Sequence, residues 1–162
     1  MPATDFRAIL RILSRHGAQF VVVGGVGAVL HGAPIHTFDL DIVHQRTGAN
    51  IEAILAALRD LNARYRLQPE RNLHPDTEHL LSPGHHLLIT DHGPVDLLGS
   101  IAPGYGYDDL LPKSVTLSIE DGLDVQILGL SAIIESKEAA GSDKDRAVLP
   151  VLRRTLDELP PK

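Results

Sequence analysis

Two aspartates one residue apart are the residues of this sequence best suited to chemistry. Asp39 and Asp41 lie in the segment 38–43, where acidic and apolar residues alternate as they do in a half-buried strand. Side chains alternate faces along a strand, so both carboxylates should point the same way, roughly 6–7 Å apart, with Phe38 on the opposite face. Carboxylates at this spacing repel each other unless a cation lies between them. Rigid oxygen ligands suit Mg²⁺, and phosphate oxygens usually complete its coordination shell.

A third carboxylate and a glycine pair complete the pattern. Asp96 lies between Val95 and Leu97 in a predicted strand, where an unpartnered charge would be costly. Gly24 and Gly25 end an apolar run, and a glycine turn of this kind exposes backbone N–H groups to which phosphate can come close. Three carboxylates can hold two divalent ions, which clamp the attacking and leaving oxygens of an in-line phosphoryl displacement. These are the groups that nucleotidyl transfer requires.

The elements that must position these residues follow from periodicity and punctuation. Apolar residues at helical spacing predict a helix from Phe6 to Leu13, with Thr4 as a cap, and another that Asn50 caps and that runs to about Asn62. Expected strands are 19–23, 38–43, the edge strands 64–67 and 78–81, and the hairpins 87–90 with 95–98 and 115–119 with 123–127. Gly24–Gly32 should be a turn into a short helix. Ser131 should cap a helix to about Ala140, and Asp143 should start a last helix that Pro150 kinks or restarts.

This order of elements predicts an α/β (α+β) fold. We expect one mixed β-sheet with helices packed mainly on one side. The 162 residues are sufficient for a single domain, 1–162, on which C-terminal helices at about 131–158 would pack.

Composition excludes several classes of protein. The formal net charge is −6, which argues against broad non-specific binding to nucleic acid. There is no cysteine, so disulfides and thiolate metal sites do not apply, and a reducing cytoplasm is the expected location. The N-terminal residues mix charges into a helical pattern and lack the apolar core of a secretion signal. No apolar run approaches the length of a membrane span, so no membrane partner is expected.

These motifs together resemble the nucleotidyltransferase superfamily related to DNA polymerase β. The small bacterial and archaeal members are most similar, including minimal nucleotidyltransferases and abortive-infection toxins. The resemblance extends from Phe20 to about Leu152, although its middle part matches only through Asp96. It rests on Val23-Gly24-Gly25, Gly32, Thr37, Asp39-Leu40-Asp41-Ile42, Val95-Asp96-Leu97-Leu98, Lys137-Glu138-Ala139-Ala140 and Lys144-Asp145.

The resemblance implies a role for each matched residue. Asp39 and Asp41 would bind two Mg²⁺ ions, and Asp96 would bind the catalytic ion and help to deprotonate the attacking hydroxyl. Binding of the NTP would involve Gly24, Gly25, Thr37, Lys137 and Lys144. The implied activity is metal-dependent transfer of NMP from an NTP, ATP included, to an acceptor hydroxyl of a protein, an RNA 3′ end or a small molecule. A toxin–antitoxin role with an antitoxin partner also follows from the resemblance.

One departure from the family pattern supports a rival hypothesis. Many relatives carry Arg two residues before the Thr, whereas this chain has Ile35, with His36 beside it. A lost phosphate contact would weaken NTP binding unless His36 or a lysine compensates. The alternative to an enzyme is therefore a non-catalytic nucleotide-binding or protein-interaction module with a decayed site.

The same residues also have ordinary structural explanations. The paired aspartates could lie on a solvated strand face, Asp96 could cap a turn, and Lys137 could extend its amine from a buried helix face. His31, His36 and His44 surround the predicted site, but no zinc-binding motif occurs. Tyr105 and Tyr107 follow the Asp96 strand in a glycine-rich loop and are candidates for stacking on a base.

Overall fold

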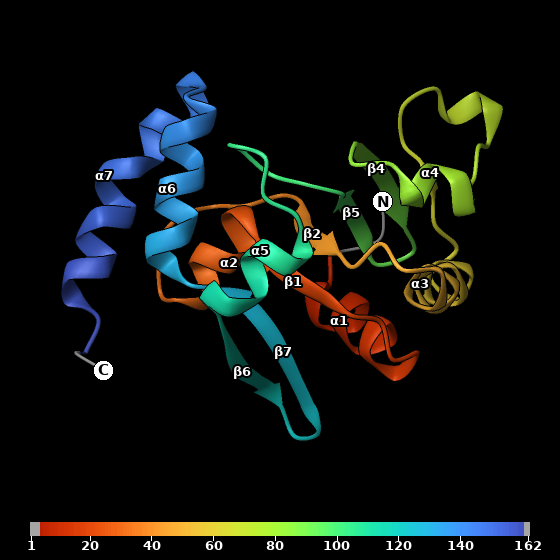
Figure 1. Cartoon of the computed structure of the whole chain (residues 1–162), viewed down its shortest axis with the longest axis horizontal. Coiled ribbons are helices and arrows are strands. Elements are labelled where there is room, and N and C mark those ends of the chain that lie inside the picture. The colour runs from red at the N-terminus through yellow and green to blue at the C-terminus, as the bar shows by residue number, and fades with distance from the viewer. Residues whose placement is uncertain (1–3, 161–162) are drawn as a thin grey trace.

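The computed structural model describes residues 4–160, so the ends of the expected domain, 1–3 and 161–162, lie outside the described residues. One seven-stranded mixed sheet, in the order β3-β4-β5-β2-β1-β7-β6, forms its centre (Figure 1). The strands are β1 (Phe20–Val23), β2 (Leu40–His44), β3 (Arg64–Tyr65), β4 (His85–Thr90), β5 (Gly93–Leu98), β6 (Ser114–Glu120) and β7 (Leu123–Leu128). The α/β class and the mixed sheet expected from the sequence are confirmed.

Seven α-helices and two 3₁₀ turns complete the described part of the chain. They are α1 (Phe6–Arg15), α2 (Gly24–Leu30), α3 (Gly48–Asp60), α4 (Thr77–Leu81), α5 (Tyr107–Leu110), α6 (Leu130–Ala140) and α7 (Asp143–Glu158), with η1 (Pro69–Arg71) and η2 (Leu111–Lys113). Across residues 4–160, no helix is both long enough and apolar enough to span a membrane.

The helices are divided between the two faces of the sheet, instead of lying mainly on one. Alternate residues of each strand point to opposite faces. Val22 and its equivalents face a core that contains Ile9 of α1 and Ile54 of α3. Val21 and its equivalents face a second core that contains Ile133 of α6 and Leu152 of α7. Figure 1 shows α6 and α7 side by side, away from α1 and α3.

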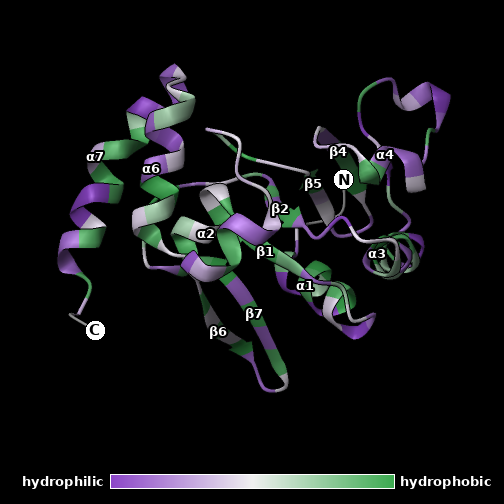
Figure 2. Ribbon diagram, viewed as in Figure 1, coloured by the Kyte–Doolittle hydropathy of each residue, from purple (hydrophilic) through white to green (hydrophobic). Residues whose placement is uncertain are grey.

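The central strands explain why the sheet holds together. All four residues of β1 are buried, and the strand is uniformly hydrophobic in Figure 2. β1 pairs antiparallel with β2 and parallel with β7, and β2 pairs parallel with β5. A strand bonded on both edges and covered on both faces is typically an unbroken apolar run, which is what 20–23 offers. β2 and β5 therefore lie side by side in the sheet interior.

Several local expectations were wrong, for identifiable reasons. Residues 78–81 belong to the helix α4 and are not an edge strand, because Asp76 accepts from the His79 N–H as a cap and Leu80 is buried beneath the turn. Phe38 is 77 % exposed and does not fill the far face, because β2 begins only at Leu40.

The helix ends also differ from the expected ones. Asp5, Thr47 and Gly129 occupy the cap positions expected for Thr4, Asn50 and Ser131. α7 continues through Pro150, which is exposed, because the buried Leu149 and Leu152 hold both halves of the helix against the sheet.

Candidate active site

The site is built where β2 and β5 run side by side. Asp41 and Asp96 are register partners on these two parallel strands, so their side chains emerge at the same level of the sheet. Their neighbours Leu40 and Leu97 are fully buried on the opposite face. Asp39 lies one residue before β2, and its side chain is 38 % exposed. The three carboxylates singled out in the sequence thus lie together on one face of the sheet.

An arginine that the sequence did not single out joins the carboxylates. Arg66 directly follows β3, and its Nη1 lies 2.5 Å from Oδ1 of Asp96 while its Nη2 lies 3.6 Å from Oδ2 of Asp39. The same Nη1 also donates to the backbone oxygen of Leu88 (3.1 Å). The side chain of Arg66 is 26 % exposed and that of Asp96 only 11 %, so this ion pair is shielded from water.

Of the three acids, Asp41 is the one that forms no ion pair with Arg66 in the described structure. Burial, together with repulsion by Asp96 and then Asp39, raises the pKa of the Asp41 carboxyl to about 7. Lys137 acts in the opposite direction on the same group. A bound cation would stabilise the ionised form of a carboxyl that resists ionisation because it is buried and lies beside other acids.

A glycine elbow lies against these acids. β1 runs directly into α2 at Gly24, whose φ of +65° is a conformation that side-chain-bearing residues rarely adopt. A Cβ on Gly24 would lie 2.5 Å from Oδ2 of Asp41, and a Cβ on Gly25 would lie 2.7 Å from Oγ1 of Thr37. Thr37 in turn donates to the backbone oxygen of Asp39 (3.3 Å). The close approach of the backbone to these side chains therefore requires both glycines.

A cavity of about 230 Å³ opens beside Asp41 and the elbow, beneath α6. Apolar side chains such as Leu98, Ile101 and Ile133 form much of its wall. Lys137 and Asp145 enter it from α6 and α7 and pair at 3.2 Å, with both side chains about four-fifths buried. Although burial raises it, hydrogen bonds from Ser142 and Lys137 lower the pKa of the Asp145 carboxyl. Lys144 is exposed and is not part of the cavity wall.

The carboxylates fit a divalent cation by chemistry, but in this structure two of them, Asp39 and Asp96, are bound to Arg66. Within residues 4–160, no three His, Asp or Glu side chains converge closely enough to hold a metal ion. The donor set nevertheless consists of hard carboxylate oxygens, and Asp41 has too little positive charge near it. Asp39, Asp41 and Asp96 are thus the residues available for a cation, with Arg66 as their present partner.

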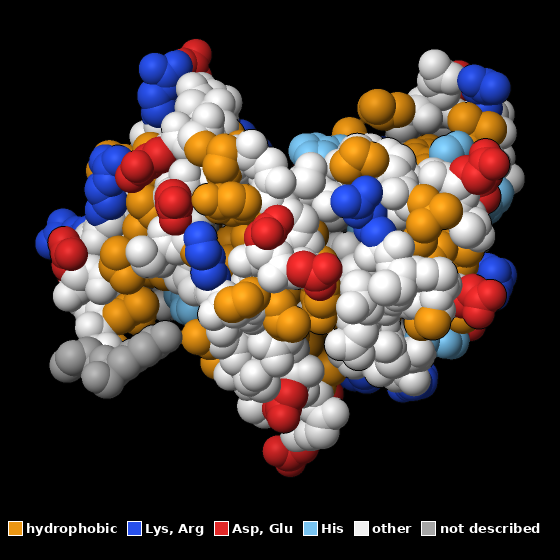
Figure 3. Space-filling view, in the orientation of Figure 1, with side chains coloured by type: hydrophobic (Ala, Val, Ile, Leu, Met, Phe, Trp, Pro, Cys, Tyr) orange, Lys and Arg blue, Asp and Glu red, His pale blue; other side chains and the backbone are white. Residues whose placement is uncertain are grey.

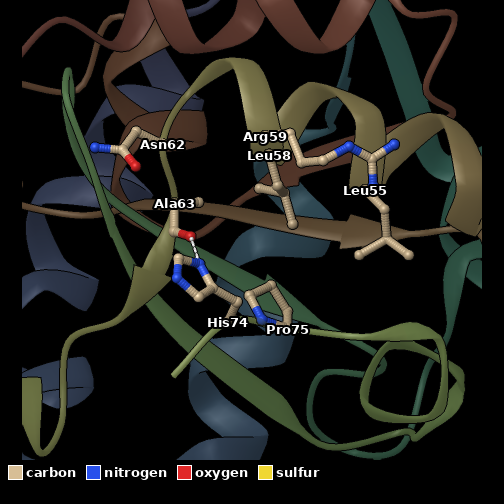
Figure 4. A pocket seen from close by; sticks show the side chains of 7 residues that line it. All are labelled: Leu55, Leu58, Arg59, Asn62, Ala63, His74 and Pro75. Atoms are coloured by element: carbon tan, nitrogen blue, oxygen red, sulfur yellow. Dashed lines mark hydrogen bonds between the residues drawn. The ribbon is translucent and has the colours of Figure 1, made fainter. Parts of the chain in front are cut away.

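A larger cavity, of about 350 Å³, lies on the other face of the sheet (Figure 4). Leu55, Leu58 and Arg59 of α3 form one side of it, and on the other side Nδ1 of His74 donates to the Ala63 backbone oxygen (3.0 Å). No carboxylate lines this cavity. It therefore lacks the groups that the chemistry predicted for this chain requires.

The histidines and tyrosines noted in the sequence have structural roles. His31 bonds the Leu128 backbone oxygen (2.8 Å), and His44 is fully buried and bonds the Leu80 backbone oxygen (2.8 Å). His36 is exposed. Tyr107 is buried in the core, so it cannot stack on a base.

Arg66 is the site residue that sequence reasoning missed. It was placed in a short edge strand without a role. Its approach to Asp96 depends on the pairing β3-β4-β5, which the residues of a two-residue strand do not specify.

Comparisons with known proteins agree with this geometry. No family model and no curated protein sequence matches the chain. Among solved structures, the lincosamide antibiotic adenylyltransferase LnuA, with lincomycin bound, superposes with a TM-score of 0.63 at 14 % identity, over 96 % of this chain and 99 % of that one. TM1012 from Thermotoga maritima, assigned as a nucleotidyltransferase, superposes with a TM-score of 0.55 at 20 % identity, over 95 % and 91 %. The chain therefore has the nucleotidyltransferase fold.

Proposed function

We propose that this protein is a metal-dependent nucleotidyltransferase that moves NMP from an NTP to an acceptor hydroxyl and releases pyrophosphate. One observation carries the proposal. Asp41 and Asp96 are register partners on neighbouring parallel strands, against the Gly24 elbow, within a nucleotidyltransferase fold. A single domain, with α6 and α7 as an integral part of its nucleotide site, belongs to this proposal.

The acidic side chains would hold the cations. Asp39, Asp41 and Asp96 supply oxygen ligands on a rigid strand pair. Bound there, divalent ions such as Mg²⁺ neutralise phosphate charge and align the attacking and leaving oxygens. The raised pKa of Asp41 supports a cation at this position, because the ionised carboxylate would gain most from it.

Other residues of the chain would bind the nucleotide. Gly24 and Gly25 would let the triphosphate approach the backbone, with Thr37 beside them. Lys137, which lines the cavity next to Asp41, would pair with a phosphate oxygen, and the exposed Lys144 would contact phosphate or acceptor. These positions would hold the α-phosphate in line with the acceptor, and this alignment is the main contribution of the protein to phosphoryl transfer.

The proposed transfer forms one bond to the α-phosphorus and breaks another. The acceptor oxygen forms a bond to the α-phosphorus, and the bond from that phosphorus to the oxygen shared with the β-phosphate breaks. Pyrophosphate leaves with the electron pair, and the hydroxyl proton passes to the carboxylate of Asp96. A carboxylate that is 11 % exposed and adjacent to the second acid is well placed to receive it.

A small-molecule hydroxyl is the acceptor class we favour. LnuA, which resembles this chain over nearly its whole length, is an adenylyltransferase of lincosamide antibiotics. Protein hydroxyls and RNA 3′ ends are the other acceptors considered. We also propose, from the sequence alone, a toxin–antitoxin role with an antitoxin partner and a cytoplasmic location. The two similar solved structures provide no evidence on either point.

Labelled nucleotides separate an enzyme from a non-catalytic module. The protein is incubated with each α-labelled NTP and Mg²⁺ together with a library of hydroxylated small molecules, a cell extract or RNA, and transfer and pyrophosphate release are measured. We expect both signals to disappear in Asp41→Asn and to persist in Asp124→Asn, which removes an exposed carboxylate on β7. NTP binding in a thermal-shift assay without any transfer would support the non-catalytic alternative.

A further inference from the structure

The guanidinium of Arg66 occupies the acidic cluster, defined as Asp39, Asp41 and Asp96. It contacts Asp96 at 2.5 Å and Asp39 at 3.6 Å, and thereby supplies a positive charge to two of the three acids. We propose that Arg66 is the resident counter-ion of the acidic cluster and that a divalent cation binds only by displacing it. The inference rests on the proposed function, since it concerns the same cation site.

Arg66 is held at this place by more than charge. Its backbone N–H donates to the Leu87 oxygen (3.1 Å), and its Nη1 donates to the Leu88 oxygen (3.1 Å), so strand β4 anchors both ends of the residue. The ion pair is largely shielded from water, with 26 % of the arginine side chain and 11 % of the Asp96 side chain exposed. An anchored, shielded pair is not the loose surface contact that contributes little.

The same oxygen atoms cannot serve both cations well. Oδ1 of Asp96 and Oδ2 of Asp39 are the atoms that face the guanidinium. A divalent ion bound to these oxygens would lie within a few ångströms of a positive charge of fixed sign, since arginine stays protonated. Occupation by the ion and retention of the guanidinium are therefore mutually unfavourable.

The surroundings leave room for the side chain to withdraw. Arg66 directly follows β3, and Figure 1 shows that the chain between β3 and α4 leaves the sheet and forms a projecting lobe. Figure 3 shows the surface hollowed between this projecting lobe and the opposite lobe formed by the adjoining ends of α6 and α7.

The test measures cation affinity, not activity. Mn²⁺ is titrated into chelator-stripped wild type, Arg66→Gln, Arg66→Lys, Arg64→Gln and Asp41→Asn, and free Mn²⁺ is followed by electron paramagnetic resonance. Removing one unit charge within a few ångströms should tighten Mn²⁺ binding about tenfold in Arg66→Gln. Arg66→Lys, whose amine cannot bridge two acids, should be intermediate. Arg64→Gln removes the same charge two residues away. In the described structure the Arg64 side chain donates only to the backbone oxygen of Asn62, so the Mn²⁺ affinity of this variant should match that of wild type.

Each outcome of the Mn²⁺ titration either supports or overturns the inference about Arg66. Tighter binding in Arg66→Gln supports the inference, because a residue needed only for structure would weaken the site when replaced. Equal or weaker binding in both Arg66 variants, with binding still lost in Asp41→Asn, overturns it while leaving the proposed metal site intact. If Arg66→Gln does not fold, Arg66→Lys alone decides by the same comparison. No Mn²⁺ binding by any variant overturns the inference and the metal-dependent function together.

Discussion

Replacing Asp41 by Asn should stabilise the protein even though it removes the proposed activity. The pKa of this carboxyl rises from 3.8 to about 7 on folding, so the folded state binds its proton more tightly than the unfolded state does. The stability that this group contributes is fully present below about pH 4 and is lost as the pH rises through about 7. At about 1.4 kcal/mol per pKa unit, the penalty above that pH has a ceiling of roughly 4 kcal/mol.

Asn removes this penalty because it keeps the shape of the side chain without the charge. We expect the variant to be more stable than wild type by about 1–3 kcal/mol at pH 8, since Asn cannot reproduce every contact of the carboxyl. The measurement is urea unfolding in the presence of a chelator, at pH 4 and at pH 8, with Asp124→Asn as the matched control. A stability gain that is the same at both pH values, or no gain at pH 8, would refute the reasoning.

Three further perturbations follow from the structure. Gly24→Ala should destabilise the fold by about 1–3 kcal/mol, because φ is +65° and the new methyl would meet Asp41; urea unfolding measures this, and an unchanged midpoint would contradict the elbow geometry. Lys137→Met should weaken NTP binding at least several-fold in a thermal-shift titration, because it removes the cation that lines the cavity and that pairs with Asp145. Unchanged affinity would show that Lys137 is not part of the nucleotide site. His44 is fully buried, and burial lowers its pKa, so its contribution to stability is present above about pH 6.5 and is lost on acidification. His44→Gln should therefore flatten the decline in unfolding free energy between pH 7 and pH 5. An identical decline in the variant would show that other groups cause it.

The sheet face that each acid takes could be predicted because it follows from short-range rules, whereas the expectation that β2 and β5 come together depended on the family resemblance. A strand turns alternate side chains to one face, so Asp41 separates from Leu40 and Ile42, and the tight turn between β4 and β5 fixes which face Asp96 takes. Gly24 marks the end of β1 because residues with a side chain rarely adopt its φ of +65°, and a Cβ on Gly25 would lie 2.7 Å from Oγ1 of Thr37. Local rules of this kind act within a few residues and can be read from one sequence.

The rest depended on long-range pairing, which a single sequence specifies weakly. Arg66 reaches Asp96 only because β3 pairs with the outer edge of β4. The sequence of a two-residue strand does not indicate the strand with which it pairs. The fate of residues 78–81 was equally open, since a segment this short fits a strand or a helix, and the burial of Leu80 against α3 and the sheet decides it. Phe38 was expected in the core on the assumption that the strand includes it. Its actual exposure depends on where the strand starts.

The order β3-β4-β5 is consecutive in the chain as well as in the sheet, so Asp96 and its ion-pair partner Arg66 lie on one meander. Loss of a single residue within β5 would exchange the two faces of that strand beyond the deletion, pointing Asp96 into the apolar layer beneath and Leu97 into the acidic cluster. The position of Asp96 therefore fixes the number of residues in β5.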